Sequence, residues 1–216
     1  MVKLNFGGHW NRGHVDHETL KFFKRLGCET MLDVGCGIGL NVEFAKDLHG
    51  YTTYGIEGDP ESIPHRVSED IFTHDFENDG YFKNKKLPNK IDLGWCVSVS
   101  EHIQAKNVPE FLDVFKRCKW VLFTWCPIGF PGYHHVNCQL TPYWQEKFLN
   151  IGFRLREDLT TSMKLDARLF MLKNCYWRDK NLNNRGRVQE GYRLLARKKK
   201  MYLKKWGLVF QNDKFI

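Results

Sequence analysis

The sequence lacks the features of a membrane, secreted or zinc-binding protein. No apolar run approaches the roughly 18 residues that a membrane-spanning helix needs, and the first seven residues do not have the pattern of a signal peptide. The seven cysteines include no Cys-x-x-Cys pair, which argues against a structural zinc site. Internal repeats and low-complexity linkers are also missing. We therefore expect a cytoplasmic protein whose cysteines are reduced.

The length and composition predict one soluble domain. The chain has 216 residues, of which 42% are apolar and 27% are charged. This is enough for one sizeable α/β core but not for two ordinary domains.

The positive charge is concentrated near the C-terminus. Residues 173–216 contain 13 Lys or Arg and 3 Asp or Glu, whereas the rest of the chain has 20 basic and 22 acidic side chains. We expect a basic helix over 188–205 and a possible contact with RNA or another polyanion through 193–206. A solvated helix that only aids solubility explains the charge equally well.

Short apolar strands alternate with helical stretches over most of the chain. This order is typical of an α/β fold with a doubly wound, mostly parallel sheet. Residues 153–155 and 169–172 are expected to supply late antiparallel strands. The division we expect is an N-terminal lid or helix (1–28), a core (29–175) and a basic C-terminal extension (176–216). The expected helices span 18–26, 40–48, 108–115 and 143–149, and the expected parallel strands span 31–34, 51–56, 71–72, 91–99 and 120–125.

The strongest motif is the glycine-rich turn LDVGCGIG at residues 32–39. Glycines accept positive φ at a sharp turn and let a ligand approach the backbone, and the following helix offers N–H groups. Asp33, two residues before the first glycine, suits a ligand that carries a cationic amino acid better than it suits a pyrophosphate. An NAD-binding loop would read Gly-x-Gly-x-x-Gly, which this turn does not match.

Acidic residues follow the next strands at regular intervals. Glu57 ends the second strand, where a carboxylate can accept both hydroxyls of a ribose. Asp75 follows the third strand and is placed to receive an adenine amino group, with Phe76 or Ile38 packing on the ring. Each acid alone is explained as a turn or cap residue, but their order and spacing together favour a nucleoside site.

Together these motifs resemble the class I S-adenosylmethionine-dependent methyltransferases over residues 29–153. The resemblance implies a Rossmann-like fold, S-adenosyl-L-methionine as cofactor and S-adenosyl-L-homocysteine as product. It also implies cofactor contacts from Asp33, Gly35, Cys36, Gly37, Gly39, Glu57, Gly58, Asp75, Phe76, Val97 and Ser98.

Histidines follow two neighbouring strands and are the candidate bases. Methyl transfer needs an aligned acceptor and often the removal of one proton, and histidine titrates near neutral pH. His102 with Glu101 follows one strand, and His134 with His135 follows the next. The topology predicts that these loops meet at one rim of the sheet. For each histidine alone, a structural hydrogen bond remains the simpler interpretation.

The same four side chains, Glu101, His102, His134 and His135, contain ligands suited to a metal. The segment partly resembles small-RNA 3′-terminal 2′-O-methyltransferases, which hold a metal with a Glu-x-x-Glu-His segment and a later histidine. Ser98 stands where that family has its first glutamate, so we expect no metal here.

Three functions follow from these observations. The first is methyl transfer to a hydroxyl of a small molecule or sugar. The second is ribose 2′-O-methylation of RNA through the basic segment, because motifs for base-amino and cytosine C5 chemistry are missing. The third is a cofactor-binding module without turnover, since a fold alone does not show a reaction. The His-rich segment 9–17 is expected to form a lid over the site.

Overall fold

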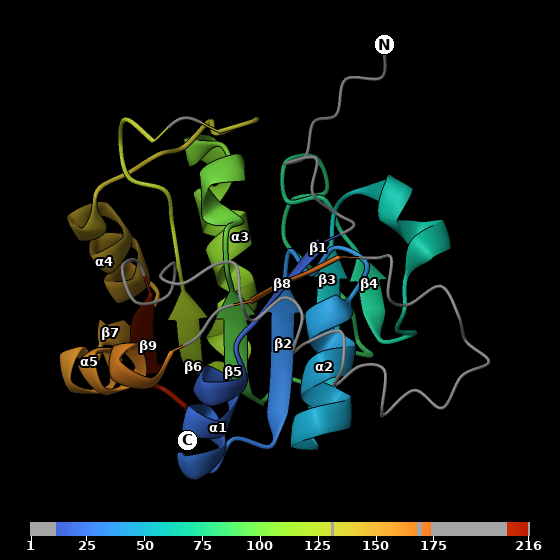
Figure 1. The fold of residues 1–216 in the computed structure, drawn as a ribbon. Helices are drawn as coiled ribbons and strands as arrows, with labels where there is room; N and C mark the ends of the chain where they lie inside the picture. The colour runs from blue at the N-terminus through green and yellow to red at the C-terminus, as the bar shows by residue number, and fades with distance from the viewer. Residues whose placement is uncertain (1–11, 131, 168–169, 174–206, 216) are drawn as a thin grey trace.

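The computed structural model describes residues 12–130, 132–167, 170–173 and 207–215. A seven-stranded sheet with the order β4-β3-β2-β5-β6-β9-β7 forms its centre (Figure 1). Five of these strands are parallel: β2 (Thr30–Val34), β3 (Thr52–Glu57), β4 (Ile71–Thr73), β5 (Ile91–Cys96) and β6 (Cys118–Phe123).

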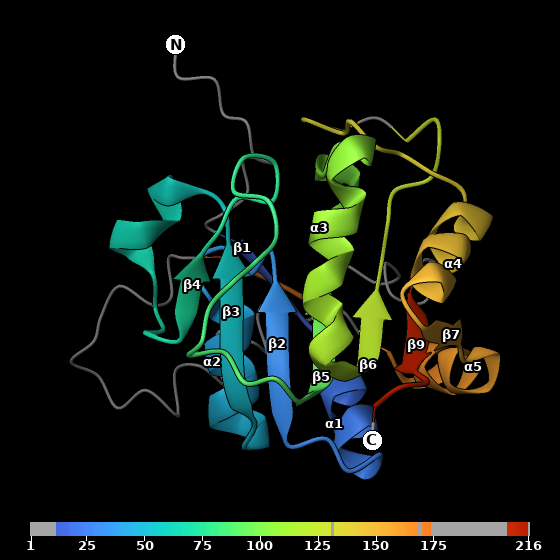
Figure 2. The ribbon, with the colours of Figure 1, turned by 180° about the vertical axis from the view of Figure 1, so that it is seen from behind.

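Helices cover both faces of the sheet. The face in front in Figure 1 carries α1 and α2, and the opposite face carries α3, as Figure 2 shows from behind. The α-helices are α1 (His17–Arg25), α2 (Leu40–His49), α3 (Val108–Asp113), α4 (Thr141–Asn150) and α5 (Glu157–Asp166). The 3-10 helices are η1 (Pro60–His65), η2 (Ser100–His102), η3 (Ala105–Asn107) and η4 (Val114–Arg117).

Alternation along the strands divides the apolar core into two layers. On β6, Val121 and Phe123 pack with residues of α3 and α4, whereas Trp120 and Leu122 pack with residues of α1, α2 and α5. Successive strand side chains point to opposite faces, so both sides of this central strand are buried. The predicted doubly wound α/β fold is confirmed.

The antiparallel part of the sheet differs from the prediction. β7 (Phe153–Leu155) was expected, but its partner is β9 (Leu208–Asn212), which lies between β6 and β7. The expected strand at 169–172 appears as β8 (Phe170–Lys173) and does not join this sheet. It pairs with β1 (Arg12–Val15) in a separate two-stranded sheet.

The expected division into 1–28, 29–175 and 176–216 stays a prediction, and the structure adds one observation near each end of the chain. β9 places residues 208–212 in the core sheet, beyond the boundary expected at 175. At the N-terminus, Leu20 and Phe23 of α1 are fully buried in the core, so this helix is part of the folded domain. The basic helix expected at 188–205 and residues 9–11 of the expected lid lie outside the described residues. Within the described ranges, no helix is long and apolar enough to cross a membrane.

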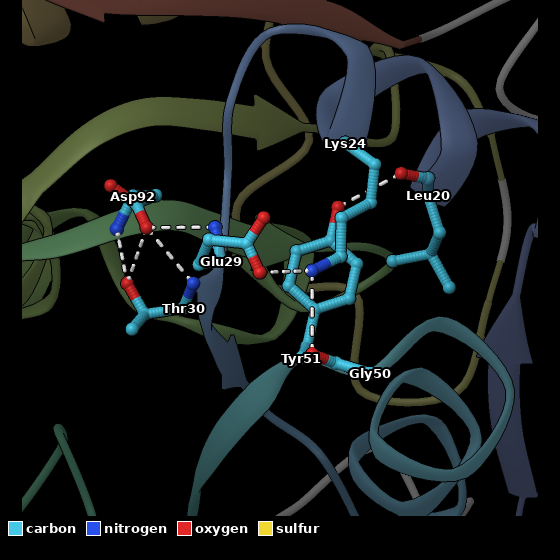
Figure 3. A network of polar contacts seen from close by, with 7 residues as sticks. All are labelled: Leu20, Lys24, Glu29, Thr30, Gly50, Tyr51 and Asp92. Atoms are coloured by element: carbon cyan, nitrogen blue, oxygen red, sulfur yellow. Dashed lines mark hydrogen bonds and ion pairs between the residues drawn. The ribbon is translucent and has the colours of Figure 1, made fainter.

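A polar network joins the amino ends of β2 and β5 (Figure 3). One Asp92 oxygen, Oδ2, accepts hydrogen bonds from the backbone N–H groups of Glu29 and Thr30, both at 2.9 Å, and from the Thr30 hydroxyl at 2.8 Å. Beside it, Lys24 Nζ lies 2.6 Å from a Glu29 carboxylate oxygen and donates to the Gly50 carbonyl at 3.3 Å. This network fixes the edge of the sheet at which the parallel strands begin.

Replacing Asp92 with Ala is expected to destabilise the fold without affecting ligands at the opposite edge. Three hydrogen bonds are lost and two backbone N–H groups lose their acceptor, which should lower the free energy of unfolding by about 2–3 kcal/mol. Urea unfolding measures the change. Glu29→Ala is the matched control, because its exposed ion pair with Lys24 should contribute under about 1 kcal/mol. Equal losses in both variants would contradict this role for Asp92.

Candidate functional site

The candidate site lies at the carboxyl edge of the five parallel strands, where the arrowheads point in Figure 1. Open α/β sheets bind ligands at this edge, because the loops there come together from neighbouring strands. The loop after β2 lies against β3: the N–H groups of Gly35 and Cys36 donate to the Ile56 carbonyl at 2.8 and 3.1 Å.

The glycine turn has the backbone that its sequence predicts. Gly35, Gly37 and Gly39 all have positive φ, at 76°, 58° and 87°. Packing also requires two of them to be glycine: a Cβ on Gly35 would lie 2.4 Å from a Val99 methyl, and one on Gly39 would lie 2.4 Å from an Ile71 methyl. The turn therefore depends on close approach within the chain as well as on any ligand.

Cys36 has a packing role within this turn. Its side chain is buried against β3, since a Cβ on Gly55 would lie 2.6 Å from Cys36 Sγ. Burial holds the pKa of this thiol well above its usual range, with the nearby carboxyls of Asp33 and Glu57 as smaller causes. The thiol is therefore protonated at neutral pH, and a cofactor contact from Cys36 would come from its backbone.

Asp33 is a buried carboxyl at the end of β2. Its side chain accepts a hydrogen bond from Asn41 Nδ2 at 3.0 Å, and the residue is 5% exposed. Burial raises the pKa of Asp33 to about 7, against the effect of that hydrogen bond. Asn41 Oδ1 is buried without a hydrogen-bond partner in the described part of the chain. The two side chains together present acceptor oxygens that a cationic donor would satisfy.

Glu57 joins the glycine turn to the next loop. One carboxylate oxygen accepts from the Gly37 N–H at 2.6 Å and the other from the Asp59 N–H at 2.8 Å. Burial raises the pKa of Glu57, while these two hydrogen bonds act in the opposite direction. Glu57 therefore fixes the shape of the glycine turn (residues 35–39) and of the loop after β3, in addition to any contact with a ribose. Asp59 Oδ2 is a further buried acceptor with no partner in the described ranges.

The residues expected at the adenine side lie in a compact turn. Asp75 Oδ1 accepts from the Glu77 N–H at 2.8 Å, and Asp75 Oδ2 accepts from Asn78 Nδ2. Phe76 is buried in the core, with its ring against Phe111 at a centroid distance of 5.4 Å. The adenine roles of Asp75 and Phe76 stay predictions.

The loop after β5 begins with an unusual backbone conformation. Ser98 has a φ of 58°, which is uncommon for a residue with a side chain and often marks a functional site. Its N–H donates to Thr124 Oγ1 at 2.9 Å, and the Thr124 carbonyl accepts from Ser100 Oγ at 3.1 Å. Thr124, which is fully buried, thus holds the loops after β5 and β6 together. Val97 is buried just before Ser98.

The two His-bearing loops meet at one rim. The Glu101 carbonyl accepts from the N–H groups of Val136 at 2.9 Å and Asn137 at 3.1 Å. The ring of His102 lies 5.1 Å from the ring of His135 and 6.4 Å from the ring of His134, between centroids. His134, like Ser98, has a positive φ, at 54°. The structure therefore brings together all four side chains named as candidates for catalysis.

Hydrogen bonds to carbonyl groups fix the tautomers of two of these histidines. His102 Nδ1 lies 3.0 Å from the His134 carbonyl, and His135 Nδ1 lies 3.3 Å from the Phe130 carbonyl. A carbonyl oxygen can only accept, so each Nδ1 carries the proton and each Nε2 carries a lone pair. Neutral His102 and His135 are thereby held in the form that accepts a proton or binds a cation.

The rim has no formal charge apart from Glu101 and any protonated histidine. Residues 120–145, which include the last four residues of β6, the loop after it and the start of α4, contain no Asp, Glu, Lys or Arg. Several apolar side chains in this loop are exposed, among them Ile128 at 64%, Phe130 at 49% and Tyr133 at 56%. Exposed apolar side chains that gather beside a site are typical of a binding surface.

Comparison with known proteins assigns the fold and the family. Residues 32–121 match the family model described as "Methyltransferase domain". This range begins in β2, ends within β6 and contains the glycine turn, Glu57 and Glu101. Over residues 32–121 the chain matches this methyltransferase family, and its structural neighbours are S-adenosylmethionine-dependent methyltransferases with the same Rossmann-like fold. Its cofactor is S-adenosyl-L-methionine.

Solved structures agree with this fold. A SAM-dependent methyltransferase from Archaeoglobus fulgidus is 15% identical, with a TM-score of 0.53, and the match covers 89% of this chain and 92% of that one. The plantazolicin methyltransferase BamL, solved with SAH and a triazolic desmethylPZN analogue, is 10% identical with a TM-score of 0.53, and the match covers 89% of this chain and 80% of that one. At these identities the likeness shows the fold and not the acceptor. No curated protein matches the chain.

The buried polar groups beside the glycine turn fit the chemistry of S-adenosylmethionine. The methionine part of S-adenosylmethionine is cationic, and the buried carboxyl of Asp33 with the unsatisfied Asn41 Oδ1 supplies acceptors for an ammonium group. The sequence analysis did not predict a role in ligand binding for Asn41 or Asp59, because the sequence pattern around each is that of an ordinary helix or turn residue. Their burial and unpartnered oxygens, which the sequence pattern does not reveal, make them candidate site residues.

Proposed function

We propose that this methyltransferase transfers the methyl group to a hydroxyl of an uncharged small molecule or sugar. The proposal depends on two features at the rim. His102 and His135 have proton-accepting Nε2 atoms, and the neighbouring residues 120–145 contain no Asp, Glu, Lys or Arg. A hydroxyl becomes a good nucleophile as it loses its proton, so acceptor groups at the reacting atom favour oxygen methylation.

The cofactor supplies a reactive methyl group on a positively charged sulfur. The chain's own residues bind and align the two reactants. Asp33, Asn41 and Glu57 bind the cofactor. The hydrogen bonds of Thr124 fix the position of the loop after β5 relative to the loop after β6. Phe130 and Tyr133 offer exposed aromatic surface against which an acceptor ring or sugar face can pack.

The proton-accepting groups proposed for the acceptor are Glu101, His102, His135 and His134. His102 and His135 are the first candidates, because their carbonyl-bound Nδ1 atoms leave Nε2 as the acceptor. Glu101 is 2% exposed and lies in the backbone segment that binds the second loop. We place His134 after these, since its Nε2 is buried rather than presented at the surface.

Methylation of an RNA ribose hydroxyl is the second candidate. Phosphate contacts dominate nucleic-acid binding, and residues 120–145 at the rim contain no Lys or Arg that could make them. They would have to come from the basic segment 193–206, which lies outside the described residues. The third candidate is a cofactor-binding module without turnover. It gives no reason for the histidines to lie together at the rim.

A panel of acceptors distinguishes the three candidates. The full chain is incubated with radiolabelled S-adenosylmethionine and either phenols, neutral sugars or a short RNA with a terminal ribose diol. We expect labelled product with members of the first two classes and salt-insensitive turnover. RNA-only labelling that weakens steeply with salt would favour the second candidate. Tight cofactor binding with no labelled product in any class would favour the third.

A further inference from the structure

Two cysteines lie side by side at the ends of the loop after β6. Cys126 is buried shortly after the strand, and Cys138 is half-buried shortly before α4. The backbone N–H of Gln139 donates to the Cys126 carbonyl at 3.1 Å, which places the backbone of Cys138 beside that of Cys126. The two thiols meet through a side-chain hydrogen bond. Residues 127–137, which contain two of the rim histidines, lie between them in the chain.

Hydrogen bonds hold both ends of this loop in place. At its beginning, the N–H of the fully buried Thr124 donates to the Cys96 carbonyl at 3.0 Å. At its end, the N–H groups of Val136 and Asn137 donate to the Glu101 carbonyl. The fold therefore keeps the two thiols together before any bond joins the sulfur atoms. A disulfide between groups held in this way costs little further loss of chain freedom.

The Cys138 thiol also contacts the histidine-bearing part of the loop. Its Sγ lies 3.8 Å from His135 Nδ1 and 3.8 Å from the Phe130 carbonyl, which His135 Nδ1 itself approaches at 3.3 Å. Because these three groups touch one another, a change at the Cys138 sulfur changes the surroundings of His135. That imidazole is one of the two groups proposed to take the proton of the acceptor.

The acidity of Cys138 is not the source of its reactivity. Burial raises the pKa of this thiol, and the charge of Glu101 is a smaller cause in the same direction, whereas the hydrogen bond with Cys126 acts in the opposite direction. Cys138 is therefore protonated at neutral pH. What favours its oxidation is partial exposure together with a second thiol at contact distance, which can complete a disulfide.

We propose that Cys126 and Cys138 form a reversible disulfide that closes the loop of residues 127–137. The oxidant is a low-molecular-weight disulfide such as oxidised glutathione. The Cys138 sulfur loses its proton, attacks the reagent and releases one glutathione thiolate. The Cys126 sulfur then loses its proton, attacks the Cys138 sulfur of the mixed disulfide and releases the second thiolate. The two protons pass to the two thiolates, so the cysteines are oxidised by two electrons and the reagent is reduced to two glutathione molecules.

The effect of this bond on turnover rests on the proposed function, whereas its formation does not. A sulfur–sulfur bond of about 2 Å is shorter than any hydrogen bond between thiols, so it draws the Cys138 sulfur toward Cys126 and away from His135. Asp33 and Glu57 lie at the ends of β2 and β3, outside this loop. We therefore expect oxidation to lower methyl transfer and to leave cofactor binding unchanged.

Peptide mapping of the full chain tests whether the bond forms. The chain is equilibrated with mixtures of reduced and oxidised glutathione, remaining thiols are blocked with N-ethylmaleimide, and the protein is cut with trypsin. The tryptic peptide 120–147 contains Cys126 and Cys138 and no other cysteine. We expect this peptide to lose both maleimide groups together, in a form two hydrogen atoms lighter than the reduced peptide, and to regain both thiols with dithiothreitol.

Two variants serve as controls. In Cys138→Ser, Cys126 should stay open to N-ethylmaleimide or carry glutathione, because its partner is gone. Cys28→Ala removes a buried cysteine before β2 and should form the bond as the wild type does. Affinity for S-adenosylhomocysteine reports the folding of each variant.

Turnover of a responsive acceptor tests the consequence. Oxidation of the wild type should lower turnover by about tenfold or more, reversibly, with affinity for S-adenosylhomocysteine within about twofold. Cys138→Ser should keep its turnover under the same conditions. Two reduced thiols in peptide 120–147 at every glutathione ratio, or a stable mixed disulfide at Cys138, would overturn the proposal. Unchanged turnover in the bridged chain would overturn its effect on the site. No turnover even in the reduced chain would contradict the proposed function instead, and the peptide map would still decide the disulfide.

Discussion

Replacing Asp33 with Asn is expected to abolish tight cofactor binding and to stabilise the cofactor-free protein. The substitution keeps the shape of the side chain and removes its negative charge. Loss of a buried, charge-assisted partner for a cationic ligand should weaken affinity for S-adenosylmethionine by roughly 10²-fold. Calorimetric titration measures this loss, with Asp92→Asn at the opposite edge of the sheet as the control.

The gain in stability follows from the pKa of Asp33. The folded protein raises it to about 7, above the value of roughly 3.9 in an unfolded chain. A raised carboxyl pKa favours folding at low pH, and this contribution is lost as the pH rises from about 4 to 7. At pH 8, Asp33→Asn should therefore raise the free energy of unfolding by roughly 1–4 kcal/mol. Lower stability in the variant would contradict a buried, desolvated Asp33.

The same pKa predicts how binding responds to pH. Protonation of Asp33 below about pH 7 removes the charge that attracts the cationic cofactor. Affinity for S-adenosylmethionine should fall by up to about tenfold per pH unit below 7 and level off above it. In Asp33→Asn this dependence should disappear.

Removing both rim histidines is expected to give the largest loss of turnover. In the double variant His102→Ala and His135→Ala, the acceptor hydroxyl loses the two groups proposed to help remove its proton. We expect turnover of a responsive acceptor to fall by about 10²–10⁴-fold, with affinity for S-adenosylhomocysteine within about twofold of wild type. His49→Gln removes an imidazole elsewhere and should retain full turnover. Near wild-type turnover in the double variant would show that His102 and His135 take no part in methyl transfer.

Local patterns were sufficient to predict the parallel half of the sheet. The strand before Gly35, the helix after Gly39 and the strand ending at Glu57 all follow from apolar spacing and turn chemistry. β9 was missed because its place is set by pairing with β6, a contact between segments some 85 residues apart that no local pattern records. Helix α5 was missed because few of its side chains are buried, so its apolar spacing is weak.

The site was predictable where motif and topology act together. Asp33 and Glu57 stand out because each ends a strand at a fixed distance from the glycine turn, and the order of the strands placed the loop of His102 beside that of His135. Asn41 and Thr124 could not be found in this way. Their importance depends on which atoms they contact in three dimensions, and a helix or strand residue of either type has no distinctive pattern.

The most direct test is calorimetric titration of the full chain with S-adenosylmethionine, S-adenosylhomocysteine and NAD. The structure and the family predict micromolar binding of both sulfur nucleosides, a strong loss of that binding in Asp33→Asn, and no binding of NAD. Failure of both sulfur nucleosides to bind would contradict the methyltransferase assignment and leave an α/β fold whose glycine turn serves another ligand.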